Sequence, residues 1–348
     1  MITFYPGPSK VYPQIATFMQ SAFEEGVLSI NHRSPECMDI TQSAIQLLHE
    51  RLNIPNQYSV YFISSATEAW EIIAQSLTKE KSTHLYNGAF GEKWAEYAGK
   101  LLKQTESIVF GVEEIASPAM LSQQEIEVLC LTQNETSNAT QIKDLSVFRK
   151  AFPESIIAVD ATSSLGGINF NWEDGDVWFA SVQKCLGLPA GMAVMICSPK
   201  AIERATEIND RKYYNSLLFI HENFMKFQTH YTPNVLNMYL LNKILYEIPN
   251  ISTISEKIKK QSKSWYEFLN TSEKFGLNCL VQNIETQSDT VIAVQGSEET
   301  IQAVKERTKL AGITLGNGYG KWKNSTFRIA NFPAIDEFEI TKLKEILG

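Results

Sequence analysis

The stretch Ala180-Ser181-Val182-Gln183-Lys184-Cys185-Leu186-Gly187 places a lysine between an apolar segment and a turn that contains glycine. Upstream, Ile156-Ile157-Ala158-Val159-Asp160 carries a carboxylate at the end of a second apolar segment. Short apolar runs bounded by turn residues are typical of strands, and strands inside a parallel sheet are apolar on both faces. We therefore predict an α/β sheet in which Asp160 and Lys184 both follow buried strands.

The middle of the chain alternates such strands with helical patterns. Apolar residues recur at helical spacing in Ala66–Leu77, Glu92–Leu102 and Leu145–Phe152. The strands that we predict are Ser59–Ile63, His84–Tyr86, Ile108–Phe110, Val128–Thr132, Ile156–Ala161, Val177–Ala180 and Met192–Cys197. This alternation predicts a mostly parallel sheet with helices on both faces.

Segment 208–234 breaks the alternation, because it is rich in Asn, Tyr, Phe and His without a clean period. We expect it to reach over another part of the molecule. Two helices, Val235–Glu247 and Ile254–Leu269, come next. The remaining chain is predicted as strand, strand, helix, strand and helix, at Asn278–Val281, Thr290–Val294, Ile301–Ala311, Phe327–Asn331 and Asp336–Ile346. The change of pattern predicts a large domain of residues 16–250 and a smaller α+β domain of residues 1–15 and 251–348.

The composition limits the class of protein. A chain of 348 residues that is 44% hydrophobic can bury a sizeable core. Its net charge of -8 argues against sequence-independent binding of nucleic acid. Neither a signal peptide nor a run of ~18 apolar residues is visible, so we expect no membrane span and a cytoplasmic location. Five cysteines without CxxC spacing fit reduced thiols better than disulfides or a zinc site, and no metal is expected.

Lys184 and Asp160 together suggest a cofactor. A partly desolvated lysine has a lowered pKa, which favours attack of its amine on an aldehyde. A buried aspartate stays ionised when a protonated pyridine nitrogen is its partner. Both groups are what an enzyme needs to hold pyridoxal phosphate. The alternatives are a solvated surface lysine and an aspartate that caps a helix, although residues 161–167 show no helical pattern.

Three other loops follow predicted strands, which is where open α/β sheets bind ligands. Ser64-Ser65-Ala66-Thr67-Glu68 could present the N–H groups of a helix start to a phosphate, or it could be only a helix cap. In Asn87-Gly88-Ala89-Phe90-Gly91-Glu92, Phe90 could stack on a flat cofactor or belong to the core. Thr132-Gln133-Asn134-Glu135-Thr136-Ser137-Asn138 has more hydrogen-bonding groups than a turn requires, with an ordinary polar loop as the alternative.

Taken as a set, these motifs resemble one enzyme family, the class V branch of the pyridoxal-phosphate aminotransferases. The resemblance implies the fold of the type I pyridoxal-phosphate-dependent transferases. Within the class, the phosphoserine aminotransferases look nearest, and the serine or alanine-glyoxylate aminotransferases are close behind. The motifs that carry the resemblance are Tyr5-Pro6-Gly7-Pro8, Asn31-His32-Arg33-Ser34, Asn134-Glu135-Thr136, Asp160, Gln183-Lys184, Pro189-Ala190-Gly191 and Phe327-Arg328-Ile329-Ala330-Asn331.

The resemblance also implies roles for single residues. Lys184 would be the Schiff-base lysine that moves the α-proton, and Asp160 would bind the ring nitrogen. Thr136 would hydrogen-bond the phenolic oxygen, and Phe90 would stack on the ring where phosphoserine aminotransferases usually have Trp. The phosphate would be bound by Ala66, Thr67 and Gln183. A Thr of the partner subunit completes this site in the family, and Tyr231-Thr232-Pro233 resembles that segment, which implies a homodimer with shared sites.

For the substrate, the resemblance assigns the α-carboxylate to Arg328, because Arg binds carboxylates in bidentate fashion. The alternative is a surface arginine on an edge strand. His32-Arg33 resembles the pair that grips the phosphate of phosphoserine, although glyoxylate-type relatives also carry it. The second His-Arg pair of phosphoserine aminotransferases is replaced by Gly318-Tyr319-Gly320-Lys321-Trp322-Lys323, in which Lys321 and Lys323 could supply charge.

These features predict ping-pong transamination of phosphoserine with 2-oxoglutarate, a step of serine biosynthesis. One alternative is a serine or alanine aminotransferase that uses glyoxylate or pyruvate. The glyoxylate-type relatives are more similar than the phosphoserine aminotransferases in the stretch Asp160-Ala161-Thr162-Ser163-Ser164-Leu165-Gly166-Gly167. The other is a chain of the same fold that binds without turning over substrate.

Overall fold

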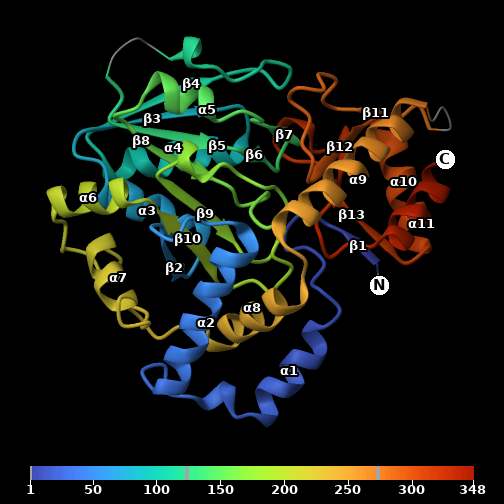
Figure 1. Ribbon diagram of the computed structural model, residues 1–348. Coiled ribbons are helices and arrows are strands. Elements are labelled where there is room, and N and C mark those ends of the chain that lie inside the picture. Colours follow the sequence, from blue (N-terminus) through green and yellow to red (C-terminus); the bar gives the residue numbers. More distant parts are fainter. Residues whose placement is uncertain (1, 122–124, 272–274) are drawn as a thin grey trace.

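The computed structural model describes residues 2–121, 125–271 and 275–348, which form two sheets with separate cores (Figure 1). Within these residues the larger sheet has seven strands in the order β2-β10-β9-β8-β5-β3-β4. Neighbouring strands are parallel except at β10, which is antiparallel to β2 and to β9. The prediction of a mostly parallel sheet is therefore confirmed. The strands are β2 (Ser59–Ile63), β3 (Lys81–Tyr86), β4 (Gln104–Val109), β5 (Val128–Thr132), β8 (Ile156–Asp160), β9 (Val177–Ser181) and β10 (Ala193–Cys197).

The central strands of this sheet are apolar because helices cover them. Every residue of β5, β8, β9 and β10 is buried, and Cys130 and Cys197 belong to this core. Helix α3 (Ala66–Ser76) packs on β9 and β10, whereas α4 (Ala89–Leu101) packs on β3, β4 and β5. Other helices of this part are α1 (Ile15–Glu24), α2 (Pro35–Leu52), α5 (Ser146–Ala151), α6 (Pro199–Ile208), α7 (Leu217–Phe224) and α8 (Val235–Glu247).

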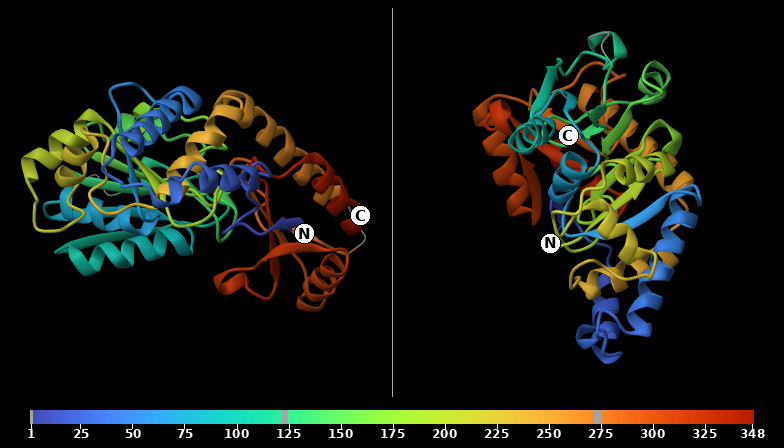
Figure 2. Two further views of the ribbon diagram at one scale, coloured as in Figure 1. Left: turned by 90° about the horizontal axis from the view of Figure 1, so that it is seen from below. Right: turned by 90° about the vertical axis from the view of Figure 1, so that its left-hand side faces the viewer.

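The smaller sheet joins the two ends of the chain. Its order is β1-β13-β14-β12-β11, in which β1 pairs parallel with β13 and the other pairs are antiparallel. Figures 1 and 2 show both termini on this lobe. Its strands come from residues 2–4 and from residues 278–330. This supports the predicted division into residues 16–250 and the two ends of the chain, which stays a proposal. The elements are β1 (Ile2–Phe4), α9 (Ile251–Thr271), β11 (Asn278–Cys279), β12 (Val291–Gln295), α10 (Glu298–Leu310), β13 (Ile313–Asn317), β14 (Thr326–Ala330) and α11 (Glu337–Leu347).

Several elements were not predicted. Strands β1 and β13 are short or partly polar. In addition, β6 (Asn134–Glu135), inside the predicted polar loop, pairs with β7 (Thr140–Gln141), which follows that loop. Segment 208–234 contains α7, whose buried face of Leu217, Ile220 and Phe224 packs toward β2. The described helices include none that is long and apolar enough to cross a membrane.

Candidate active site

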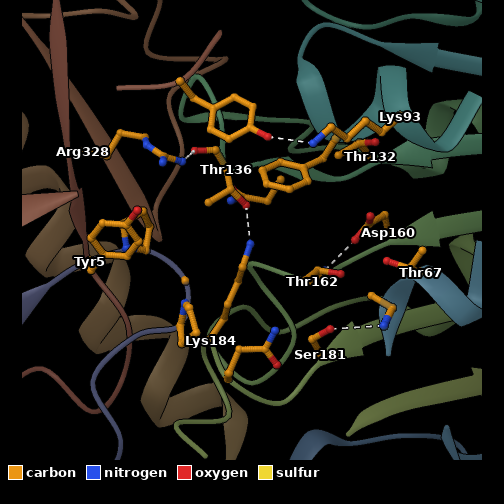
Figure 3. A pocket seen from close by; sticks show the side chains of 18 of the residues that line it. Tyr5, Thr67, Lys93, Thr132, Thr136, Asp160, Thr162, Ser181, Lys184 and Arg328 are labelled. Atoms are coloured by element: carbon orange, nitrogen blue, oxygen red, sulfur yellow. Dashed lines mark hydrogen bonds between the residues drawn. The ribbon is translucent and has the colours of Figure 1, made fainter. Parts of the chain in front are cut away.

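A cavity of about 450 Å³ lies between the two sheets, at the carboxyl ends of the parallel strands (Figure 3). Thr132, Asp160 and Ser181 are the last residues of β5, β8 and β9, and all three line it. The smaller sheet contributes Arg328. Among the site residues predicted from the sequence, those that line the cavity are Ala66, Thr67, Phe90, Thr136, Asp160, Gln183, Lys184 and Arg328.

Lys184 follows β9 and is buried, so the alternative of a solvated surface lysine is wrong. Its Nζ donates a hydrogen bond to Thr136 Oγ1 at 2.7 Å. Burial lowers the pKa of Lys184 to about 8, although the negative charges of Asp160 and Glu135 oppose the shift. The turn after the lysine depends on Gly187, which has φ +64° and lies against Tyr12. The amine is thus held in the cavity with a pKa that favours its neutral, nucleophilic form more than in a free lysine.

Asp160 ends β8 between β9 and β5, in the middle of the sheet. One carboxylate oxygen accepts the N–H of Thr162 at 2.9 Å, and the following residues form a turn, so the alternative of a helix cap is wrong. Burial raises the pKa of Asp160. None of the ion pairs between described residues includes this carboxylate. A buried carboxylate in this position is suited to a cationic partner such as a protonated pyridine nitrogen.

Polar atoms without a protein partner surround these two residues. Thr132 Oγ1, Thr162 Oγ1 and Gln183 Oε1 are buried, make no hydrogen bond to any described residue, and belong to residues that line the cavity. The cavity also meets the start of α3, where Ser65 is the N-cap and the N–H of Ala66 donates to Ser181 Oγ. Helix starts bind phosphate groups readily. The donor set therefore fits pyridoxal phosphate: an amine, a buried carboxylate, a helix start and unpaired hydroxyls.

Phe90 lies in the first turn of α4 and lines the cavity instead of filling the core. Its ring centroid is 5.1 Å from Lys184 Nζ. The start of α4 is fixed by Glu135, whose carboxylate accepts the backbone N–H groups of Phe90 (3.1 Å), Gly91 (3.2 Å) and Ser137 (2.9 Å). Glu135 is buried, and burial raises its pKa. Glu135 belongs to the predicted polar loop but was not predicted as a site residue, because hydrogen bonds to distant backbone groups are not visible in a sequence.

Arg328 is buried on β14, which lies between β13 and β12, so the alternative of an edge strand is wrong. Its Nε donates to the carbonyl of Asn317 and its Nη1 to the carbonyl of Thr136, both at 2.7 Å. These two bonds fix the plane of the guanidinium and use neither N–H of Nη2. Burial lowers the pKa of Arg328, and none of the ion pairs between described residues includes its guanidinium. The geometry is suited to a substrate carboxylate.

Three predicted residues lie outside this cavity in the same chain: His32, Arg33 and Thr232. Arg33 and Thr232 are exposed, and Arg33 Nη1 donates to Gln228 Oε1 at 3.3 Å, which places the His32-Arg33 loop beside segment 208–234. Lys321 and Lys323 do not line the cavity either, and Lys321 Nζ lies 4.5 Å from the centroid of the Trp322 ring.

Segment 208–234 is tied to the start of α3 by Glu68. This carboxylate accepts hydrogen bonds from Ser64 and from the Tyr214 hydroxyl (2.8 Å), and His230 Nε2 lies 3.8 Å away. Burial alone would raise the pKa of Glu68, but His230 and these hydrogen bonds lower it to about 2. The contact links the helix start at the cavity to the segment that carries Thr232.

Comparison with known proteins decides the family. The family model described as Aminotransferase class-V matches residues 3–319. The chain belongs to this family. It is 30% identical to a phosphoserine aminotransferase of Rhodococcus opacus over 97% of this chain and 91% of that one. The solved structure of a phosphoserine aminotransferase from Cytophaga hutchinsonii is 31% identical, with a TM-score of 0.94 over 99% of this chain and 98% of the other.

More distant likenesses show the fold alone. The alanine-glyoxylate aminotransferase from Nostoc sp. is 20% identical with a TM-score of 0.83, covering 100% of this chain and 95% of that one. Together the comparisons confirm the predicted fold type I, the dependence on pyridoxal phosphate and the assignment as a transaminase. A chain of this fold without catalytic activity is not favoured.

Proposed function

We propose that this class V aminotransferase transfers the amino group of phosphoserine to 2-oxoglutarate, as a cytoplasmic enzyme of serine biosynthesis. The observation that carries the proposal is that one cavity holds the buried Lys184, Asp160 and Arg328. The relatives of about 30% identity are named phosphoserine aminotransferases, whereas the alanine-glyoxylate enzyme is 20% identical. The glyoxylate-type alternative is therefore not favoured.

We assign the cofactor-binding residues as follows. Asp160 would hold the pyridine nitrogen, Thr136 the phenolic oxygen, and Phe90 one face of the ring. The phosphate would lie at the start of α3. Its ligands would be Ala66, Thr67 and Gln183, the last with an unpaired Oε1.

When bound, the cofactor supplies an aldehyde that takes the amino group and a ring that withdraws electrons from the substrate α-carbon. Lys184 Nζ takes the proton from that carbon and later gives it up again, so the amine acts first as a general base and then as a general acid. A pKa of about 8 suits this role, because both protonation states are accessible near neutral pH. Arg328 orients the substrate by its carboxylate.

The enzyme is proposed to be a homodimer in which His32, Arg33 and Thr232 complete the cavity of the partner subunit. In support, these residues do not line their own cavity, and Arg33 is hydrogen-bonded to Gln228 of the segment that carries Thr232. Exposed apolar side chains are present on nearby elements: Phe23 on α1, Leu28, and Met225 after α7. Glu68 contacts Tyr214 and His230 and so fixes the position of segment 208–234, which carries Thr232.

Half-reaction spectroscopy tests the substrate. Phosphoserine, serine, alanine and glutamate are each added to the cofactor-loaded enzyme, and the change of the visible absorption band is followed. We expect rapid conversion with phosphoserine and glutamate. Rapid conversion with serine or alanine but none with phosphoserine would overturn the assignment.

Hybrid dimers test the shared site. Lys184→Ala and Thr232→Ala subunits, each weakly active alone, are co-expressed and mixed. Shared sites predict that hybrids regain activity, because one of their two cavities contains both intact residues. A mixture with only the summed activity of the parents contradicts the proposal.

A further inference from the structure

Two polar side chains from different lobes meet at the wall of the cavity. Lys93 lies on α4 of the large sheet, and Tyr319 follows β13 of the small sheet. Both line the cavity, and Lys93 Nζ donates a hydrogen bond to the Tyr319 hydroxyl at 2.9 Å. Figure 3 marks this bond, with Lys93 on the side of the cavity opposite to Lys184.

Tyr319 lies between two residues that fix the positions of the cofactor and the substrate. Its ring centroid is 5.5 Å from that of Phe90 and 5.5 Å from the guanidinium carbon of Arg328. A substrate whose α-carbon lies at Lys184 and whose α-carboxylate lies at Arg328 must extend its side chain along the remaining wall. Tyr319 lies next to Arg328 on that wall, and Lys93 is hydrogen-bonded to Tyr319.

The pair has unused hydrogen-bond donors. Because Tyr319 accepts from Lys93, its own O–H is free to donate, and the ammonium group retains two further N–H donors. No carboxylate forms an ion pair with Lys93 anywhere in the described ranges. Lys321 and Lys323, the lysines that the sequence suggested, do not line the cavity. A cation and a phenol O–H together are suited to an anionic oxygen group such as a phosphate or a carboxylate.

We propose that Lys93 and Tyr319 bind the distal acidic group of the substrate, the phosphate of phosphoserine and the side-chain carboxylate of glutamate, in addition to His32 and Arg33 of the partner subunit, which the proposed dimer brings to the same cavity. Lys93 and Tyr319 would be specificity-determining residues, and their hydrogen bond joins the two lobes. The inference rests on the proposed function for phosphoserine, but its claim about a distal acid extends to glutamate as well.

The test uses the cofactor-loaded enzyme and the variants Lys93→Met, Lys93→Arg and Tyr319→Phe, with Lys321→Met as the matched control outside the cavity. Loss of a charge-assisted hydrogen bond predicts that Lys93→Met raises KM for phosphoserine and glutamate roughly 10- to 100-fold with a smaller change in kcat. Tyr319→Phe should raise the same KM values less. Lys93→Arg should restore most of the affinity, and Lys321→Met should behave like the wild type. The half-reaction with serine, which lacks a distal acid, should be unaffected by any of them.

Two results would overturn the inference: unchanged KM values for both acidic substrates in Lys93→Met, or an equal effect on serine. Thermal unfolding of each variant shows that the fold is intact. If the wild type converts glutamate but not phosphoserine, and Lys93→Met still raises KM for glutamate, the distal-acid role is supported while the phosphoserine assignment fails.

Discussion

Replacement of Glu135 by alanine should loosen the start of α4, the turn that carries Phe90. The Glu135 carboxylate accepts three backbone N–H groups, from Phe90, Gly91 and Ser137, and it is buried. An unpaired buried donor costs about 1–3 kcal/mol. The buried charge itself also costs free energy, as its raised pKa indicates, so the lower end of the range applies. The N–H groups of Gly91 and Ser137 are buried, whereas that of Phe90 is only partly buried. Two unpaired buried donors then predict a loss of about 2 kcal/mol in the free energy of unfolding.

Denaturant unfolding of the cofactor-free protein measures this loss. Glu135→Gln keeps one acceptor oxygen and should fall between alanine and the wild type. Glu92→Ala, which removes an exposed carboxylate from the same helical turn, is the matched control and should leave the unfolding midpoint nearly unchanged. If Glu135→Ala unfolds at the same denaturant concentration as the wild type, the carboxylate does not hold the helix start.

A second readout follows from the charge of Glu135. Burial sets the low pKa of Lys184, and the negative charges of Asp160 and Glu135 raise it. Removing one of these charges in Glu135→Gln should therefore lower the pKa of Lys184 below about 8. An unchanged pKa would mean that Glu135 has no electrostatic effect on the amine.

Three further predictions concern other residues. In the cofactor-free protein, the neutral amine of Lys184 is the reactive form. The rate of capture of pyridoxal phosphate should therefore rise about tenfold per pH unit and level off above the pKa of about 8. A rise that continues to pH ~10 would match an ordinary lysine and contradict this prediction. Arg328→Lys should raise KM for the amino acid roughly 10-fold or more, because a lysine cannot make the bidentate contact, as half-reaction titration would show. Gly187→Ala should destabilise the protein more than Gly312→Ala does, because both have positive φ but only the Cβ at Gly187 meets a neighbour, Tyr12 at 2.6 Å; equal unfolding midpoints would contradict this.

The parallel sheet and the cofactor-binding edge could be predicted because their signals are local. Asp160 ends one apolar strand and Lys184 follows another, and the carboxyl ends of parallel strands meet at one edge. The sequence left two interpretations of Arg328 open, a ligand of the substrate carboxylate and a surface residue on an edge strand. The strand order decides between them, because β14 lies inside the sheet.

The unpredicted features depend on contacts between distant segments. Strand β1 has only three residues and pairs with β13, more than 300 positions away in the chain. The meeting of Lys93 with Tyr319 requires the relative position of the two lobes, which no spacing in the sequence fixes. Helix α7 was missed because its buried apolar face is embedded in a segment rich in polar and aromatic residues.

The central claim is that Lys184 is the residue that bonds to the cofactor in this cavity. The most direct measurement is borohydride reduction of the cofactor-loaded enzyme, followed by proteolysis and mass spectrometry. The account predicts one peptide with the added mass of the reduced cofactor, attached at Lys184, and no such peptide in Lys184→Ala. Attachment at another lysine, or none in the wild type, would contradict it.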